Sequence, residues 1–128
     1  MLARRLERKP GLTLETAAAT LRDTPASGLE HQELAERCGA RERTRVAWMG
    51  PAGHPLFAWL LAASTQLGAT MILYGGERIW QVAARQSAQI LALPGPLDAA
   101  PPDMVDLQMV ITAGRGNDAV HFDIAWHL

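Results

Sequence analysis

Cysteine is almost absent from this sequence, since Cys38 is the only one among 128 residues. A single thiol excludes an internal disulfide and any zinc cluster built on several cysteines, and it favours a reducing compartment. No apolar run approaches the roughly 20 residues that a transmembrane helix needs. The basic start MLARRLERKPG is not followed by the apolar core of a secretion signal. The sequence therefore predicts a soluble, cytoplasmic chain without a membrane partner.

Charge is also scarce and nearly balanced. Charged residues make up 20% of the chain, hydrophobic residues 48%, and the formal net charge is −1, which is typical of a globular domain and gives no overall attraction to nucleic acid. The basic residues that cluster are Arg4, Arg5, Arg8 and Lys9. We interpret them as a solvated terminal helix. The alternative is a nucleic-acid accessory that uses them together with Arg115.

The residue pattern changes near residue 44. We expect a single compact domain made of a helical N-terminal extension (1–43) and an α/β core (44–128). Apolar residues at helical spacing predict helices over 14–21 and 31–38 in the extension, with Cys38 on the apolar stripe of the second. Residues 27–30 match a capping box that would open this second helix.

The core is marked by short apolar runs with helical segments between them. Runs at 46–49, 70–74 and 89–93 predict strands buried on both faces, and helical patterns at 55–67 and 79–86 separate them. Connections this short favour right-handed crossovers and a parallel sheet. The predicted fold class is α/β, with a central, mainly parallel sheet flanked by helices.

The tail changes period again, because runs at 107–112 and 119–128 flank a glycine-rich loop and predict a C-terminal antiparallel β-hairpin. Alternation in the second run predicts one packed face and one polar face. The apolar set expected on the packed face is Val120, Phe122, Ile124, Trp126 and Leu128. His121, Asp123 and His127 fall on the polar face. We interpret this face as solvated, because His121 and Asp123 would lie about 7 Å apart along a strand, too far for one metal ion without bending.

The loop after the first strand enters a helix, which is where α/β sheets usually bind anions. It reads GPAGHP over residues 50–55. A phosphate-binding loop needs a lysine and a hydroxyl that are missing here, and the dinucleotide pattern of three glycines also fails. We therefore expect neither nucleotide hydrolysis nor a cofactor. The loop either merely turns the chain or binds an anion through Gly50, Gly53 and His54, with Glu77 as a further ligand candidate.

Two stretches, RTRVAWMGPAGHPLFAWLLAASTQLGATMILYGGE and VDLQMVITAGRGNDAVHFDIAWHL, together resemble the RecA-like superfamily, specifically its degenerate members of the SulA and ImuA type. The first is similar to the family's first strand, phosphate-loop region, helix and second strand, and the second to its closing hairpin. The family's Walker A lysine and its acidic strand for magnesium have no counterpart here. The resemblance thus implies a non-catalytic, protein-binding role in the DNA-damage response or in division control.

A second resemblance competes with the first. The stretch ELAERCGARERTRVAWMGPAGHPLFAWLLAASTQLGA looks like part of the N-terminal subdomain of AMP-forming acyl-CoA ligases. The Ser/Thr/Gly-rich nucleotide loop ending in Pro-Lys of that family is missing, so the resemblance does not imply adenylation by this chain.

The function predicted from the sequence is a non-enzymatic, regulatory interaction module, with a protein partner and a homodimer as expected assemblies. Arg115 in the hairpin loop and Trp126 near its end are the candidate partner contacts. The alternative is a small-ligand or nucleotide-binding protein or enzyme that uses the loop after the first strand.

Overall fold

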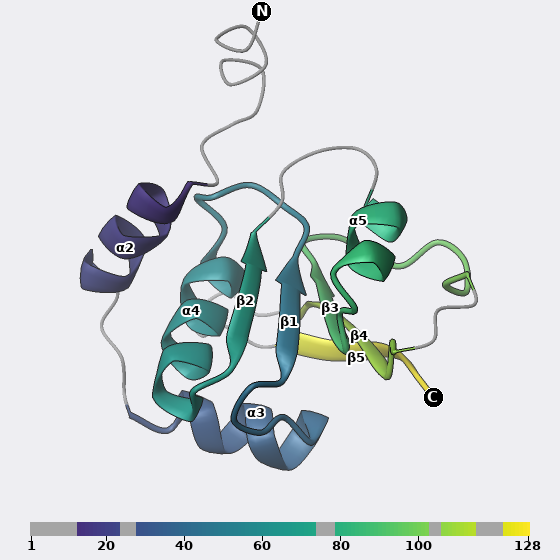
Figure 1. Cartoon of the computed structure of the whole chain (residues 1–128), viewed down its shortest axis with the longest axis horizontal. Helices are drawn as coiled ribbons and strands as arrows, with labels where there is room; N and C mark the ends of the chain where they lie inside the picture. Colours follow the sequence, from purple (N-terminus) through teal and green to yellow (C-terminus); the bar gives the residue numbers. More distant parts are fainter. Residues whose placement is uncertain (1–12, 24–27, 74–78, 103–105, 115–121) are drawn as a thin grey trace, which may run out of the picture.

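The fold is a five-stranded sheet with helices, as seen in a computed structural model that describes residues 13–23, 28–73, 79–102, 106–114 and 122–128 (Figure 1). The strands are β1 (Arg45–Trp48), β2 (Thr70–Leu73), β3 (Ile90–Leu93), β4 (Met109–Ala113) and β5 (Phe122–His127). The helices are α2 (Leu14–Asp23), α3 (Glu30–Cys38), α4 (Pro55–Leu67) and α5 (Ile79–Arg85). The predicted α/β class is therefore confirmed. The helix expected before Pro10 lies outside the described residues.

The sheet has the strand order β2-β1-β3-β4-β5. The pairs β1–β2, β1–β3 and β3–β4 are parallel, and β4 pairs with β5 in antiparallel orientation. The mainly parallel sheet with a C-terminal antiparallel hairpin is thus as predicted. The chain leaves β1 in one direction along the sheet and returns past it to β3, and right-handed crossovers in opposite directions place their helices on opposite faces.

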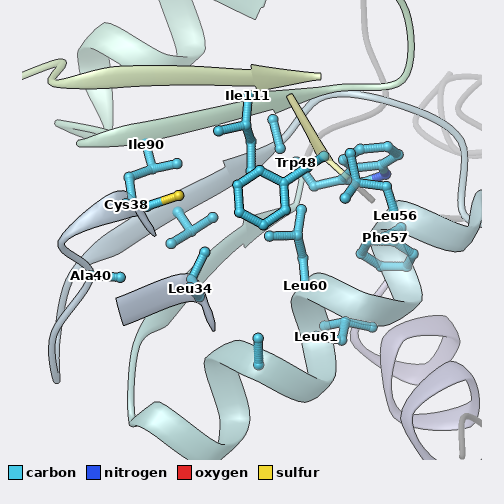
Figure 2. Packing of buried hydrophobic residues seen from close by; sticks show 14 of the residues in the cluster. Leu34, Cys38, Ala40, Trp48, Leu56, Phe57, Leu60, Leu61, Ile90 and Ile111 are labelled. Carbon is cyan, nitrogen blue, oxygen red and sulfur yellow. The ribbon is translucent and has the colours of Figure 1, made fainter. Parts of the chain in front are cut away.

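One face of the sheet is covered by α3 and α4, and α2 packs against α4. Val46 and Trp48 of β1 point to this face and pack with Leu34 of α3 and with Phe57 and Leu60 of α4. Figure 2 shows Trp48 beside Leu56 and Phe57 of α4. Each side chain named in this paragraph is at most 1% exposed. This layer therefore holds most of the large buried side chains.

The opposite face is covered by α5 and by the segment between β3 and β4. Ala47 and Met49 alternate with the residues above and point to this side, where Leu91 of β3 and Ala83 of α5 are fully buried. Because successive side chains of a strand point to opposite faces, burial on both sides gives β1 and β3 their unbroken apolar sequences.

Helix ends follow local chemistry with one exception. The helix α4 begins at Pro55, whose missing N–H is harmless in the first turn, and it ends at Gly68 with φ 80°, the left-handed conformation that glycine adopts most easily. The capping box expected at residues 27–30 depends on Ser27, which lies outside the described residues. The N-cap of α3 is Leu29, and the Glu30 carboxylate accepts from the Gly28 N–H at 3.0 Å.

The strict alternation expected along β5 is also wrong. Val110 pairs with Trp126, but the next residue, Ile111, pairs with Ile124, so Ala125 forms a β-bulge. A bulge inserts one residue and shifts the facing of all that follow. Ile124 therefore shares a face with Ile111, whereas Trp126 packs on the α5 side.

No helix in the described ranges is both long enough and apolar enough to cross a membrane.

Candidate functional site

The loop between β1 and α4 lies at the carboxyl edge of the sheet, beside the segment that follows β3. This is the switch point of the fold, because the chain leaves β1 toward β2 and passes on the other side of β1 to reach β3. In open α/β sheets the crevice at such a point is the usual ligand site. The loop after the first strand thus lies at this switch point, and its geometry decides what it can bind.

The first turn of α4 has its backbone amides occupied by the chain itself. His54 is the N-cap, and its ring nitrogen Nδ1 accepts a hydrogen bond from the Leu56 N–H at 3.1 Å. The N–H groups of Phe57 and Ala58 donate to the His54 carbonyl at 3.1 and 3.4 Å, and Pro55 has no N–H. Anion sites at helix N-termini depend on free amides, and this turn offers none.

Trp48 holds the same loop from beneath. Its indole Nε1–H donates to the Pro51 carbonyl at 3.1 Å, and its ring lies 5.4 Å from the ring of His54 and 5.8 Å, nearly parallel, from that of Phe57. Trp48 itself is fully buried. The loop thus packs on the indole ring of Trp48 and is fixed to it by a hydrogen bond.

The two candidate glycines of the loop differ in what surrounds them. A Cβ at Gly50 would lie 2.7 Å from Cζ2 of Trp48 and 3.0 Å from the ring of Pro94, which means that Gly50 allows the loop to approach its own core and the segment after β3. Gly53 has no atom within 4 Å of such a Cβ. The close approach that glycine permits is used for internal packing at Gly50, where a dinucleotide fold would use it for a phosphate.

His54 is held in its neutral form. Because Nδ1 accepts from a backbone N–H, the proton of the neutral ring sits on Nε2. Burial lowers the pKa of His54 below its ordinary value of 6.5, since an apolar surrounding disfavours the charged ring. At neutral pH this side chain is a helix cap with one remaining donor, and it carries no positive charge for an anion.

The described hairpin candidates, Asp123 and His127, have no recorded hydrogen bond to this loop. Asp123 pairs with Thr112 and His127 with Met109, and these two partners lie on opposite faces of β4, so Asp123 and His127 also face opposite sides. The one polar face expected for them is thus wrong. In the described part of the chain, no group of three or more His, Cys, Asp or Glu residues could hold a metal ion.

Three further candidates, Glu77, Arg115 and His121, lie outside the residues that the structure describes. Trp126 is half-buried against the α5-side cluster, so part of its ring belongs to the core. Cys38 is a core residue of α3, as predicted, and burial raises the pKa of its thiol from 9.0 to about 11. Such a thiol is a poor nucleophile at neutral pH.

An arrangement that sequence reasoning missed joins α3 to β5. The guanidinium of Arg37 lies 4.0 Å above the ring of Phe122 and donates to the Phe122 carbonyl at 3.1 Å, and it pairs with Glu33 at 3.1 Å. The ring of Trp59 lies 5.2 Å from that of Phe122. No local pattern could reveal this, because 85 residues separate Arg37 from Phe122. The spacing of Glu33 and Arg37 predicts only their own ion pair.

Comparisons of this chain with family models, with curated proteins and with solved structures give no match.

Proposed function

We propose that this chain is a non-catalytic protein-interaction module and that it pairs with a second copy of itself along the outer side of β2. The observation that carries the proposal is the contrast between a helix α4 whose first amides are bonded within the chain and an apolar strand that has no partner on its outer side among the described residues. The resemblance to degenerate RecA-like proteins points in the same direction, and the proposal does not depend on it.

The carboxyl edge of the sheet supports the non-catalytic part. Among the described residues at this edge, two side chains are ionisable: His54 in the loop after β1, and Asp123 of β5, which pairs with Thr112 near the end of β4. Catalysis by general acid or base needs a group with a free proton position in a cleft. The Nδ1 of His54 is occupied by α4, and none of the hydrogen bonds recorded for the described residues joins Asp123 to His54.

The composition of β2 supports the interaction part. Edge strands are usually guarded by charged residues, proline or a bulge, and β2 reads TMIL, with none of these. Thr70 is exposed, and the three apolar residues that follow are half-buried. An unguarded edge of this kind favours the addition of another strand.

The geometry of β2 favours a second copy as that strand. The Thr70 N–H donates to Thr44 on the β1 side at 2.9 Å, so the backbone groups of Met71 and Leu73 point outward. In an antiparallel pair with its two-fold axis at Ile72, Met71 of each copy lies opposite Leu73 of the other. Four main-chain hydrogen bonds result, and paired side chains share a face of the continuous sheet.

The test is the oligomeric state over protein concentrations from about 1 μM to about 1 mM, the range of weak protein affinities. The wild-type mass is expected to rise toward that of a dimer. Met71→Pro removes an outward N–H and leaves the β1 side intact. It is expected to weaken the dimer at least about tenfold, because two hydrogen bonds are lost per pair. A wild type that stays monomeric throughout would contradict the proposal.

Two lysine variants provide a matched control. Thr70→Lys places a charge at the β2 edge, and Ala125→Lys places the same charge at the exposed bulge of β5. Only the first is expected to weaken association. Thermal unfolding with ATP, ADP or an acyl-adenylate analogue checks the non-catalytic part. Stabilisation by any of them would favour the ligand-binding alternative.

A further inference from the structure

The N-cap of α4 is a histidine, whereas most helices use Ser, Thr, Asp or Asn at this position. Those side chains accept a hydrogen bond throughout the physiological pH range. The Nδ1 of His54 can accept from Leu56, 3.1 Å away, only while the ring is neutral, because a protonated imidazole has a donor at both nitrogens. The cap therefore contains a group that can lose its function by gaining one proton.

We propose that His54 makes the β1–α4 loop a pH-sensitive latch, in which protonation of the ring breaks the cap of α4 and releases residues 50–54 from Trp48. Protonation turns Nδ1 from an acceptor into a donor that faces another donor, the Leu56 N–H. It also places a positive charge at the positive end of the helix dipole. Both effects act against the closed loop.

Among the described residues, α4 and the strands β1 to β4 place no carboxylate beside His54, and Asp123 of β5, which pairs with Thr112, has no recorded hydrogen bond to it. The helix α4 contains no ionisable residue, and neither do β2, β3 and β4. On β1 the one such residue is Arg45, whose side chain donates to the Ser87 carbonyl at 2.7 Å. The segment after β3 has none before Asp98. A charged His54 would therefore have no carboxylate on these elements to stabilise it.

The helices packed against α4 carry charges, which act elsewhere. The ionisable residues of α2 and α3 are Glu15, Arg22, Asp23, Glu30, His31, Glu33, Glu36, Arg37 and Cys38. His31 bonds to Gln66 at 2.8 Å, near the other end of α4, and Arg37 bonds to Glu33 and Phe122. None of the hydrogen bonds or ion pairs recorded for the described residues joins any of these side chains to His54.

The loop depends on few contacts, so the loss of one matters. Two side-chain hydrogen bonds fix it, from Trp48 to Pro51 and from Leu56 to His54, and the rings of Trp48 and His54 are in contact. When the imidazole is released, the bond from Trp48 to Pro51 is the one of these two hydrogen bonds that remains. Burial, which lowers the pKa of His54 from its ordinary value of 6.5, supports a closed loop at neutral pH and release at a lower pH than for an exposed histidine.

The experiment is an NMR titration of the full chain from about pH 8 to about pH 5, the range through which histidines titrate. At the upper end the ring of His54 is expected to carry its proton on Nε2. The exchange protection of the Leu56 amide, corrected for the intrinsic pH dependence, is expected to fall about fivefold as His54 titrates, the loss typical of a missing cap. The indole N–H of Trp48 should shift with the same midpoint.

The controls separate this histidine from the others. His54→Asn keeps a capping acceptor that does not titrate, so its Leu56 protection is expected to stay constant, and His54→Ser serves in the same way if the asparagine variant folds poorly. His31→Asn removes a histidine at the other end of α4 and should retain the wild-type response. The proposal is overturned if Leu56 protection in the wild type does not follow the His54 titration. It is also overturned if the ring is protonated on Nδ1 at the upper end.

Discussion

The two edge strands of the sheet, β5 and β2, differ in how they are shielded from pairing with another strand. At β5 the first residue, Phe122, is buried under the guanidinium of Arg37 and beside Trp59, the strand is bent by a bulge at Ala125, and Asp123 and His127 are exposed on it. At β2 four uncharged residues run without a bulge and pair only with β1 among the described strands.

This difference separates a strand held to its own helices from a strand open to another chain. Bulges and exposed charges discourage further pairing, and a side chain such as Arg37 ties the strand to the layer above it. The β2 edge has no bulge and no charge, and the side-chain bond recorded between it and a helix is that from the Ser64 hydroxyl of α4 to the Met71 sulfur at 3.2 Å. Under the proposed function, the β5 side of the molecule contributes stability and the β2 side interaction, and each part can be tested separately.

The largest effect is expected for Phe122→Ala. This change removes a ring that is 1% exposed and lies between Trp59 and Arg37, and large-to-small changes of a buried phenylalanine cost about 3–5 kcal/mol. Urea unfolding measures it. Ile124→Ala on the same strand is the control, because Ile124 is 37% exposed and should lose about 1 kcal/mol or less. Equal losses for the two variants would break the assignment of stability to the buried end of β5.

The reactivity of Cys38 reports whether α3 stays closed over β5. Burial raises the pKa of this thiol from 9.0 to about 11, so at a pH below both values the thiolate fraction, and with it the rate of alkylation, should be about 100-fold lower than for a free thiol. Phe122→Ala should accelerate alkylation and Thr70→Lys should not. A native thiol as reactive as that of the urea-unfolded chain is the contrary result.

The same thiol gives a pH dependence of stability at the alkaline side. Between pH 9.0 and about 11 the unfolded chain has released the Cys38 proton while the folded chain retains it, so the folded state binds more protons and the free energy of unfolding falls as the pH rises. Cys38→Ala is expected to flatten this fall. Urea unfolding at several pH values measures the slope, and an equal slope in the variant would argue against a buried, protonated thiol.

A smaller effect is expected for Arg37→Ala, which removes the contact with the Phe122 ring and the hydrogen bond to its carbonyl. The two interactions together stabilise the fold by about 1–2 kcal/mol. Arg41→Ala is the matched control, since only the backbone of Arg41 takes part in a recorded hydrogen bond, and it should change the free energy of unfolding by less than about 0.5 kcal/mol. Similar losses in the free energy of unfolding for both variants would mean that Arg37 does not stabilise β5.

The smallest change in stability is expected for Thr70→Lys at the β2 edge. Thr70 is exposed, so the free energy of unfolding measured at low protein concentration should move by less than about 0.5 kcal/mol. A loss of 2 kcal/mol would mean that the β2 edge supports the fold itself, and the contrast between the two edges would disappear.

Sequence reasoning succeeded where the cause of a structure is local. Pro55 and Gly68 mark the ends of α4, and the unbroken apolar runs of β1 and β3 follow from burial on both faces. It failed where distant parts decide the outcome. The bulge at Ala125 depends on the pairing of β5 with β4, and the bond from Arg37 to Phe122 depends on the packing of α3 over the hairpin.

The candidate site shows the same division. The loop at residues 50–55 was located correctly because a strand followed by a helix N-terminus is a local pattern. That His54 occupies the amide of Leu56, and that Gly50 touches Pro94, depends on side-chain geometry and on a segment 44 residues further along, from Gly50 to Pro94. Composition could show that the phosphate-binding lysine is missing, and only the fold reveals that the amides at the start of α4 are bonded within the chain.

Amide exchange of Met71 and Leu73 at low and at high protein concentration tests the interaction edge most directly. The account predicts that both amides, which point away from β1, exchange rapidly when the chain is dilute and become protected as it associates, while the amides of Thr70 and Ile72 are protected at both concentrations. A dimer in which Met71 and Leu73 exchange as fast as in the dilute sample would contradict it.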